Sequence, residues 1–251
     1  FEGEETFQNI FSLTDNRGRI EQMGIGNDIR LTNEQILSNV QAIQLRNGLP
    51  QTTAQEFETN GMNFSVEMET GTGKTYVYLK TICELNKRYG FTKFIIVVPS
   101  IAVKEGTKKT LEITRSHFKG DYENVVYNWF VFDSSNLDQV RAFATSENVE
   151  IMVINIDAFR KSFENYEEEN KANIIHRYND PLGYKPIDLV RDTRPIVIID
   201  EDYRSENSSG LGIRALAQAI EDEGMEVLGV TSYGDLSQFA QQQSRASAFV
   251  L

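Results

Sequence analysis

Residues 68–75 have the sequence Met68-Glu69-Thr70-Gly71-Thr72-Gly73-Lys74-Thr75, and this stretch decides the fold. It follows a short apolar run that begins at Phe64 and precedes a helical pattern that begins at Tyr76. A strand, a glycine-containing loop and a Lys-Thr pair that opens a helix are typical of a phosphate-binding loop. The backbone N–H groups of such a loop and the helix N-terminus form an electropositive anion site. The stretch therefore predicts binding of a nucleoside triphosphate.

The loop assigns a role to each of its residues. Lys74 would reach the β- and γ-phosphates, and the Thr75 hydroxyl would bind Mg²⁺. Met68 stands where the general pattern has its first glycine, a departure that suits the helicase variant of the loop. A chance glycine-rich turn is the alternative, but the required strand and helix contexts are both present. The predicted ATP-binding residues are Thr70, Gly71, Thr72, Gly73, Lys74 and Thr75.

Strands and helices alternate along the chain after the loop. Continuous apolar runs at 93–98, 150–155 and 196–199 predict strands that are covered on both faces, as in a parallel sheet. Helical patterns at 76–89, 101–118 and 137–145 separate further strands, including one at 125–132. A first helix starts after Leu31, with Thr32 or Asn33 as its cap. These elements predict a mostly parallel, doubly wound α/β sheet in three α/β/α layers, that is, a RecA-like P-loop NTPase domain.

The strand at 196–199 leads into two carboxylates, Asp200 and Glu201. Ligands of open α/β sheets bind beyond the carboxyl ends of the strands, where the Gly71–Thr75 loop also falls. Asp200 would hold Mg²⁺, and Glu201 would orient and activate the attacking water. On its own, an acidic strand end can simply cap the next helix. Paired with the loop, it predicts Lys74, Asp200 and Glu201 as catalytic residues and Thr75 and Asp200 as metal ligands.

Composition limits the partners of the chain. The net charge of −12 over 251 residues argues against strong nonspecific DNA binding by this chain alone. A single cysteine excludes an internal disulfide and fits a reducing compartment, so we expect a cytoplasmic protein; no apolar run approaches the ~18 residues of a membrane span. A local basic strip stays possible, although a solvated helix face explains it more simply: Lys104, Lys108, Lys109, Arg115 and Lys119.

Four segments, 67–77, 94–100, 154–159 and 193–201, resemble the restriction subunit of type III restriction–modification enzymes, a DNA endonuclease system. The resemblance covers about residues 30–201. It implies a superfamily 2 helicase-like ATPase that uses ATP and Mg²⁺ and acts on DNA with a methyltransferase (modification) partner. It assigns Gly71, Gly73, Lys74 and Thr75 to ATP, and Asp200 and Glu201 to Mg²⁺ and hydrolysis. Pro99 and Ser100 resemble motif Ia of that family, a candidate DNA-backbone contact.

The match departs from the family after Glu201, where Asp202-Tyr203 replaces the usual Pro-Gln. Residues 202–251 resemble the N-terminal wing domain of bacterial ornithine/lysine/arginine decarboxylases, although simple divergence is the alternative. We therefore expect a chimeric or truncated chain with three parts. These are a poorly ordered N-terminal remnant at 1–30, the helicase-like domain at 31–201, and a β-α-β-type extension at 202–251 on the same sheet, with a helix at 214–223 and a strand at 227–230.

What is missing shapes the functional prediction. No second motor domain is visible, so we expect an ATP-binding domain that is incomplete and weakly active; the alternative is an inert α/β scaffold with a vestigial loop. Thr231-Ser232 falls where a helicase carries its Ser-Ala-Thr motif, which we interpret as a coincidence. The family's adenine-reading glutamine motif is not evident, and the candidates by residue type alone are Gln35, Gln41, Gln44 and Gln51.

Overall fold

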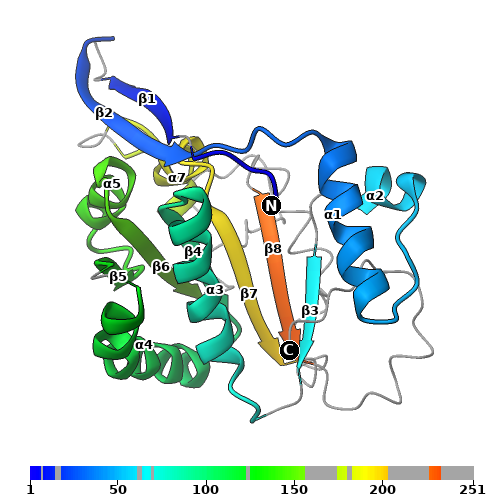
Figure 1. The fold of residues 1–251 in the computed structure, drawn as a ribbon. Helices are drawn as coiled ribbons and strands as arrows, with labels where there is room; N and C mark the ends of the chain where they lie inside the picture. The colour runs from blue at the N-terminus through cyan, green and yellow to red at the C-terminus, as the bar shows by residue number, and fades with distance from the viewer. Residues whose placement is uncertain are drawn as a thin grey trace, which may run out of the picture.

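The computed structural model describes residues 1–6, 8–14, 18–60, 64–68, 71–122, 125–155, 174–179, 183–202 and 226–232. Among these residues, six strands form one sheet in the order β3-β8-β7-β4-β6-β5 (Figure 1). Every neighbouring pair is parallel, which confirms the predicted parallel sheet. The strands are β3 (Phe64–Met68), β4 (Lys93–Val98), β5 (Tyr127–Val131), β6 (Val149–Asn155), β7 (Ile196–Asp202) and β8 (Glu226–Ser232).

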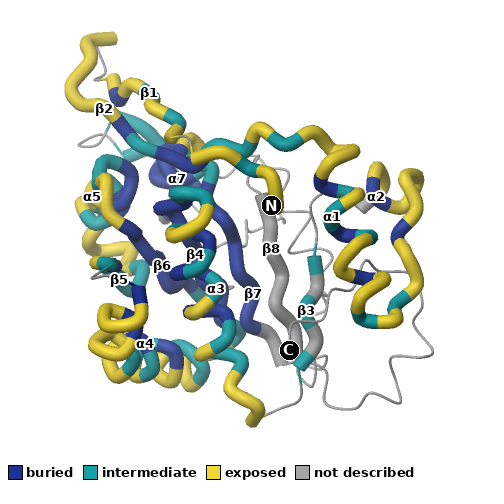
Figure 2. The backbone as a smooth tube through the Cα atoms, viewed as in Figure 1, coloured by how far each residue is buried: buried dark blue, intermediate teal, exposed yellow. Residues whose placement is uncertain are grey.

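Helices cover both faces of this sheet. α3 (Lys74–Tyr89) and α4 (Ile101–Asp121) pack on one face, while α5 (Asp138–Thr145) and α7 (Pro186–Asp192) pack on the other. Successive residues of a strand point to opposite faces. The apolar runs of β4, β6 and β7 therefore contribute side chains to the hydrophobic cores on both faces of the sheet. Figure 2 shows these strands as buried along their length. The predicted three-layer, RecA-like α/β/α architecture is confirmed.

The strand order separates the strand before the glycine loop, β3, from the strand that carries Asp200, β7. β3, which leads into the loop, and β7, which carries Asp200, are not neighbours, because β8 lies between them. Val230 of β8 is in register with Val66 on one side and with Asp200 on the other. β8 corresponds to the strand predicted at 227–230, and it is part of the main sheet. The helix predicted at 214–223 lies outside the described residues.

Two short helices lie beside β3. α1 (Asn33–Arg46) begins with Thr32 as its N-cap, and Gln35 completes a capping box. α2 (Ala54–Asn60) was not anticipated from the sequence. A small apolar cluster of Ile36, Val40 and Phe57 joins the two helices. Neither helix contributes to the two cores of the sheet.

The first 30 residues differ from the prediction of a poorly ordered remnant. They contain β1 (Gln8–Thr14) and β2 (Ile20–Asn27), which pair as an antiparallel hairpin. The hairpin was not predicted because apolar residues lie on both of its faces: Ile10 (62%) and Ile20 (65%) are exposed, whereas Leu13 is buried, so the sequence shows no simple apolar–polar alternation. Gly26 lies so close to the chain at Thr193 that a Cβ there would be 2.5 Å from the Thr193 carbonyl oxygen.

Asn27 joins the hairpin to the amino ends of β4 and β7. Its buried side-chain amide donates to the carbonyl oxygens of Lys93 (2.9 Å) and Arg194 (3.0 Å). Its side-chain oxygen accepts from the backbone N–H groups of Thr92 (2.9 Å) and Lys93 (3.1 Å). One side chain thus satisfies four backbone groups at the end of the sheet.

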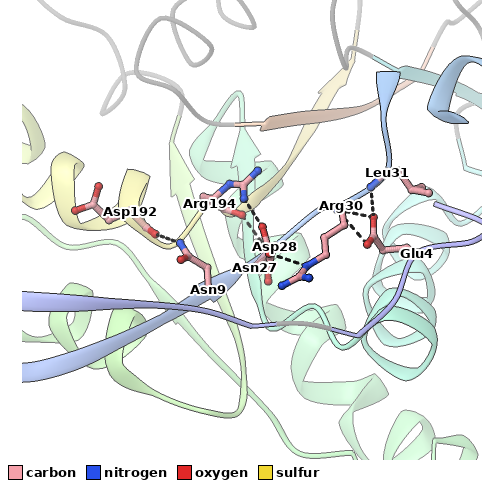
Figure 3. A network of polar contacts seen from close by, with 8 residues as sticks. All are labelled: Glu4, Asn9, Asn27, Asp28, Arg30, Leu31, Asp192 and Arg194. Atoms are coloured by element: carbon pink, nitrogen blue, oxygen red, sulfur yellow. Dashed lines mark hydrogen bonds and ion pairs between the residues drawn. The ribbon is translucent and has the colours of Figure 1, made fainter. Parts of the chain in front are cut away.

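Further polar contacts surround this junction (Figure 3). The Arg194 guanidinium contacts the Asp28 carboxylate at 2.6 Å. The Glu4 carboxylate accepts from the backbone N–H groups of Arg30 (3.1 Å) and Leu31 (3.2 Å). The N-terminal segment is therefore fastened at several points to the amino end of the sheet.

The polar excursion predicted at 160–192 is described only in part. Its described portion holds a short 3₁₀ turn at Ile174–His176 and then α7. Residues 156–173 and 180–182 lie outside the described residues. Within the described part of the chain, no helix is both long enough and apolar enough to span a bilayer.

Candidate nucleotide-binding site

The loop before α3 has a backbone that only glycine adopts easily. Gly71 and Gly73 have φ angles of 82° and 91°, in the left-handed region. A Cβ built at either position would have no described atom within 4 Å, so these glycines are required by conformation and not by crowding. Residues 71–73 are exposed, which leaves the loop surface open to a ligand. Thr70 lies outside the described residues.

The N-terminus of α3 lacks the usual side-chain cap. Gly73 is the cap residue, no side-chain cap bond is present, and the first turn contains no acidic residue. The first intrahelical bond runs from the Val77 N–H to the Gly73 carbonyl at 3.0 Å. The N–H groups of the first turn therefore have no intrahelical acceptor, and the helix dipole adds to their attraction for an anion. Lys74 and Thr75, both half-buried, begin this turn.

One hydrogen bond connects α3 to the acidic strand end. The Tyr78 hydroxyl donates to Asp200 Oδ2 at 3.0 Å, and it lies 3.2 Å from Thr107 Oγ1 of α4. All three side chains are buried. Tyr78 follows Lys74 and Thr75 by four and three residues, so it lies one helical turn beyond them on the same side of α3. The structure thus brings the first turns of α3 against Asp200. This contact forms although β3, the strand before α3, is not adjacent to β7, the strand that carries Asp200.

Strand parity explains why Asp200 meets Tyr78. Ile196 and Ile198 of β7 belong to the core under α3 and α4, whereas Val197 and Ile199 belong to the opposite core. Asp200 continues the even-numbered set, so it points to the face covered by α3 and α4. Glu201 is in β7, but its side chain lies outside the description.

The environment keeps the Tyr78 hydroxyl protonated. Burial raises the pKa of Tyr78 far above its ordinary value, and the negative charge of Asp200 raises it further. Hydrogen bonds from Thr107 and Thr75 act in the opposite direction and are weaker than burial. The same tyrosine hydroxyl thus contacts Asp200, and the Thr75 side chain contributes to its electrostatic surroundings.

The oxygen atoms gathered here fit Mg²⁺. Thr75 offers a hydroxyl and Asp200 a buried carboxylate, both hard ligands of the kind that Mg²⁺ prefers. The described residues hold no cluster of three or more His, Cys, Asp or Glu side chains that would form an all-protein cage. That agrees with the usual habit of Mg²⁺, which takes one or two protein ligands and fills its shell with phosphate oxygens and water.

The predicted DNA contact at Pro99 and Ser100 follows β4 at the same edge of the sheet. The Ser100 side chain caps α4, because its Oγ accepts from the Val103 N–H at 3.3 Å. This bond gives Ser100 a structural role whatever else it contacts.

The candidate glutamines all have partners near α1. Gln35 completes the cap of that helix, and the side chain of Gln51 donates to the Gln41 carbonyl at 3.4 Å. Gln44 is buried and exchanges two bonds of 2.8 Å with Thr52, whose carbonyl also accepts from Gln41 at 2.8 Å. These bonds explain the glutamines as supports of the α1 region.

Sequence reasoning did not single out Tyr78 or Thr107. The available signal was indirect: Tyr78 lies three to four residues after Lys74-Thr75, and Asp200 lies at an even position of an alternating strand. Combining helix and strand periodicities would have placed both side chains on the same face of the sheet.

Comparison with known proteins identifies the family. The family model described as type III restriction enzyme, res subunit, matches residues 27–232. The chain is 29% identical over 193 residues to the type III restriction-modification enzyme EcoPI Res subunit of Escherichia phage P1. It is also 29% identical over 197 residues to the EcoP15I Res subunit of Escherichia coli. Both alignments cover 70% of this chain but only 19% of the relative, so the chain spans about one fifth of the length of the curated relatives it matches.

A solved structure gives a more distant match. The crystal structure of the DUF1998 helicase MrfA bound to DNA aligns with 100% of this chain and 33% of that chain. Its TM-score is 0.44 and the sequence identity is 12%, too low to add to the topology described above.

The family match continues past Glu201, through β8 to Ser232, and β8 pairs with both β7 and β3, as expected for an extension on the same sheet. Thr231 is in register with Glu201 and Glu67 inside the matched region, and its interpretation as a coincidence stays a prediction. The resemblance to a decarboxylase wing stays a prediction only for 233–251, outside the described residues. With more than three quarters of its length matched, the chain belongs to the family of type III restriction enzyme Res subunits.

Proposed function

We propose that this chain is the nucleotide-binding motor domain of a type III restriction enzyme, binding ATP with Mg²⁺ and hydrolysing it slowly when the 251 residues are tested by themselves. The observation that carries the proposal is the buried bond from Tyr78 to Asp200. It places the predicted metal-site carboxylate against the helix that starts at the loop. The uncapped N-terminus of that helix and the open surface of the loop support the same conclusion.

Each residue has a role in this proposal. The loop amides and Lys74 bind the phosphates, while Thr75 and Asp200 hold the metal. Glu201 orients the attacking water. When bound, Mg²⁺ would neutralise negative charge on the phosphates, so the protein mainly contributes positioning.

Nucleotide titration of Lys74→Ala tests the proposal. We expect the variant to lose ATP–Mg²⁺ affinity by at least about 100-fold, because a charge-assisted phosphate contact is removed. Lys80→Ala is the matched control, since Lys80 is an exposed cation on the same helix, beyond the first turn. Binding at 100 times Kd should stabilise the wild-type fold by about 2.7 kcal/mol in thermal unfolding. Equal affinity of wild type and Lys74→Ala, or no stabilisation of the wild type, would leave an inert scaffold as the better account.

The 251 residues, tested by themselves, are expected to hydrolyse ATP slowly. In related phosphoryl transfer, an arginine supplied from across the nucleotide cleft contributes ~10³–10⁵ in rate. We expect ATP turnover by this chain to be lower by a comparable factor than turnover by a full-length Res subunit. In that full enzyme, we propose that the domain acts on DNA together with the modification methyltransferase subunit, as part of an endonuclease.

A cationic stripe on α4 favours a DNA-backbone contact next to Pro99 and Ser100. Its four cations are separated by four, seven and four residues, so they lie along one flank of the helix. His117, which contacts Tyr76 of α3 at 2.8 Å, projects from the opposite flank. In the described part of the chain, none of the four forms an ion pair, which is unusual for a protein of net charge −12. The stripe consists of Lys104, Lys108, Arg115 and Lys119.

Charge reversal at neighbouring positions tests this contact. Lys108→Glu removes a stripe cation, whereas Lys109→Glu makes the same change on the outer face of α4, off the stripe. We expect only Lys108→Glu to weaken duplex DNA binding and to reduce the salt slope, by about 1 for each lost phosphate contact. If both variants lost DNA affinity equally, the effect would come from net charge and not from the stripe. If neither lost affinity, the stripe would not contact DNA.

A further inference from the structure

The Tyr78 hydroxyl makes two buried hydrogen bonds whose directions follow from the groups involved. A tyrosine hydroxyl has one proton to donate and two lone pairs to accept with. Its proton is directed to Asp200 Oδ2 at 3.0 Å, because a carboxylate can only accept. The 3.2 Å contact with Thr107 must therefore have the threonine hydroxyl as donor.

This arrangement fixes the direction of the Tyr78 proton. Thr107 is buried on α4, and its donated hydrogen bond leaves the tyrosine proton free to point at Asp200. A carboxylate at the end of a strand otherwise has a broad choice of side-chain torsions. A buried donor aimed at one oxygen restricts the orientation of that carboxylate.

We propose that Tyr78 is a positioning residue for Mg²⁺ in the nucleotide site: its hydroxyl holds the Asp200 carboxylate in one geometry, and Thr107 orients that hydroxyl. This inference rests on the proposed ATP–Mg²⁺ binding and adds a residue outside the loop and the acidic pair. Tyr78 acts on the metal through Asp200. Its substitution should therefore alter the response to Mg²⁺ more than the affinity for the nucleotide itself.

The link also reaches α4. Thr107 lies in the helix that begins at the Ser100 cap and carries the cationic stripe. A shift of α4 on α3 would change the 3.2 Å contact first and the Asp200 contact second. The Tyr78 hydroxyl is thus the shortest described polar connection between the predicted metal site and the helix that follows the predicted DNA contact.

Two tyrosine substitutions in the 251-residue chain provide a matched test. Tyr78→Phe removes the hydroxyl bonded to Asp200, and Tyr122→Phe removes a hydroxyl bonded to Glu84 at 2.8 Å, away from the site. The measurements are ATP affinity in EDTA, the Mg²⁺ concentration that gives half of the affinity gain, and the unfolding temperature. For Tyr78→Phe we expect the Mg²⁺ midpoint to rise by about threefold to tenfold, with affinity in EDTA changed less than about twofold. Tyr122→Phe should leave both binding values unchanged.

Thr107 supplies an independent variant. Thr107→Val keeps the shape and loses the hydroxyl, so we expect the Mg²⁺ midpoint to rise by a smaller factor, about twofold to threefold. Thr107→Ser keeps the hydroxyl and should restore the wild-type midpoint. A purely structural role would lower the unfolding temperature of both variants without this recovery in the metal response.

The outcomes separate this inference from the proposed function. If Lys74→Ala binds ATP as well as wild type, nucleotide binding by the loop fails and the positioning role fails with it. If Lys74→Ala loses binding but Tyr78→Phe and Thr107→Val keep the wild-type Mg²⁺ midpoint, the proposed function stands and the positioning role is overturned. A midpoint that rises in both variants and recovers in Thr107→Ser supports it.

Discussion

The two ends of the same parallel sheet are built in opposite ways. At the amino end, the Asn27 side chain satisfies backbone groups of β4 and β7, and the N-terminal segment fastens over them. At the carboxyl end, the N-terminus of α3 has no side-chain cap, the glycine loop is exposed, and Asp200 is held by a tyrosine hydroxyl. At the amino end a side chain satisfies the backbone groups, whereas at the carboxyl end the first N–H groups of α3 have no side-chain cap.

This contrast teaches how one sheet can be both stable and able to bind. Buried backbone groups without partners are costly, so a strand end must find hydrogen bonds in the protein or in a ligand. Here the amino end is closed by side chains from the hairpin, far away in sequence. Substitutions at the amino end should therefore change stability and spare binding, and substitutions at the carboxyl end should do the reverse.

The largest expected effect on stability is that of Asn27→Ala. It removes four hydrogen bonds and leaves buried backbone groups unpaired, so we expect a loss of about 3–5 kcal/mol in urea unfolding. Asn9→Ala is the control, because that half-buried side chain makes one long bond of 3.4 Å to the Asp192 carbonyl. If folded Asn27→Ala protein lost ATP affinity as strongly as Lys74→Ala, the expected separation of stability at the amino end from binding at the carboxyl end would be wrong.

Lys93 gives the amino end a pH dependence. The Lys93 side chain is buried at the start of β4, and burial lowers its pKa to about 8, with Glu150 opposing the shift. Between that value and its ordinary pKa of 10.5, the unfolded chain binds more protons than the folded chain. The free energy of unfolding should therefore rise with pH, by about 2 kcal/mol from pH 8 to pH 10.

Urea titrations of wild type and Lys93→Met across this range isolate the effect. The variant should lack the rise, so the difference between the two proteins should change with pH in that window and stay flat below it. The titration ends at pH 10. Above that pH, buried tyrosines with a raised pKa, such as Tyr127, also change the free energy of unfolding. A parallel pH response in both proteins would show that Lys93 is not the source.

A pair of glycines sharpens the contrast at the carboxyl end. Gly73 and Gly48 have φ angles of 91° and 67°, and a Cβ at either meets no described atom within 4 Å. Alanine at each should cost about 1–2 kcal/mol of stability for the left-handed backbone. Only Gly73→Ala should also reduce ATP affinity, because it alters the loop. Equal affinities for the two variants would argue that the loop geometry is not used for binding.

The smallest effect concerns Arg194, a non-glycine residue with a positive φ of 46° next to the amino end of β7. Arg194→Gly relieves the backbone strain, whereas Arg194→Ala does not, and both lose the ion pair with Asp28. We expect the glycine variant to be more stable than the alanine variant by about 1 kcal/mol in thermal unfolding. A difference near zero would mean that the surrounding hydrogen bonds impose no strain there.

The carboxyl end was far easier to predict from the sequence than the amino end. The loop is a local motif, and the buried runs of β4, β6 and β7 are each continuous, so neighbouring residues carry the signal. The hairpin and Asn27 depend on contacts with residues 65 to 167 positions away, which no local pattern encodes. Tyr78 and Thr107 were missed for a similar reason: each looks like an ordinary helix residue until α3, α4 and β7 are packed together.

β8 has a consequence for how this protein is made. Among the described strands, β3 pairs only with β8, which begins about 160 residues later in the chain. During synthesis, the ribosome has released β4, β5, β6 and β7 before β3 gains its partner. The strand that leads into the nucleotide loop therefore cannot pair in this sheet until β8 has been made, although it is the first of the six to be translated. Premature release of the nascent chain before Glu226 would leave β3 without its partner among the described strands.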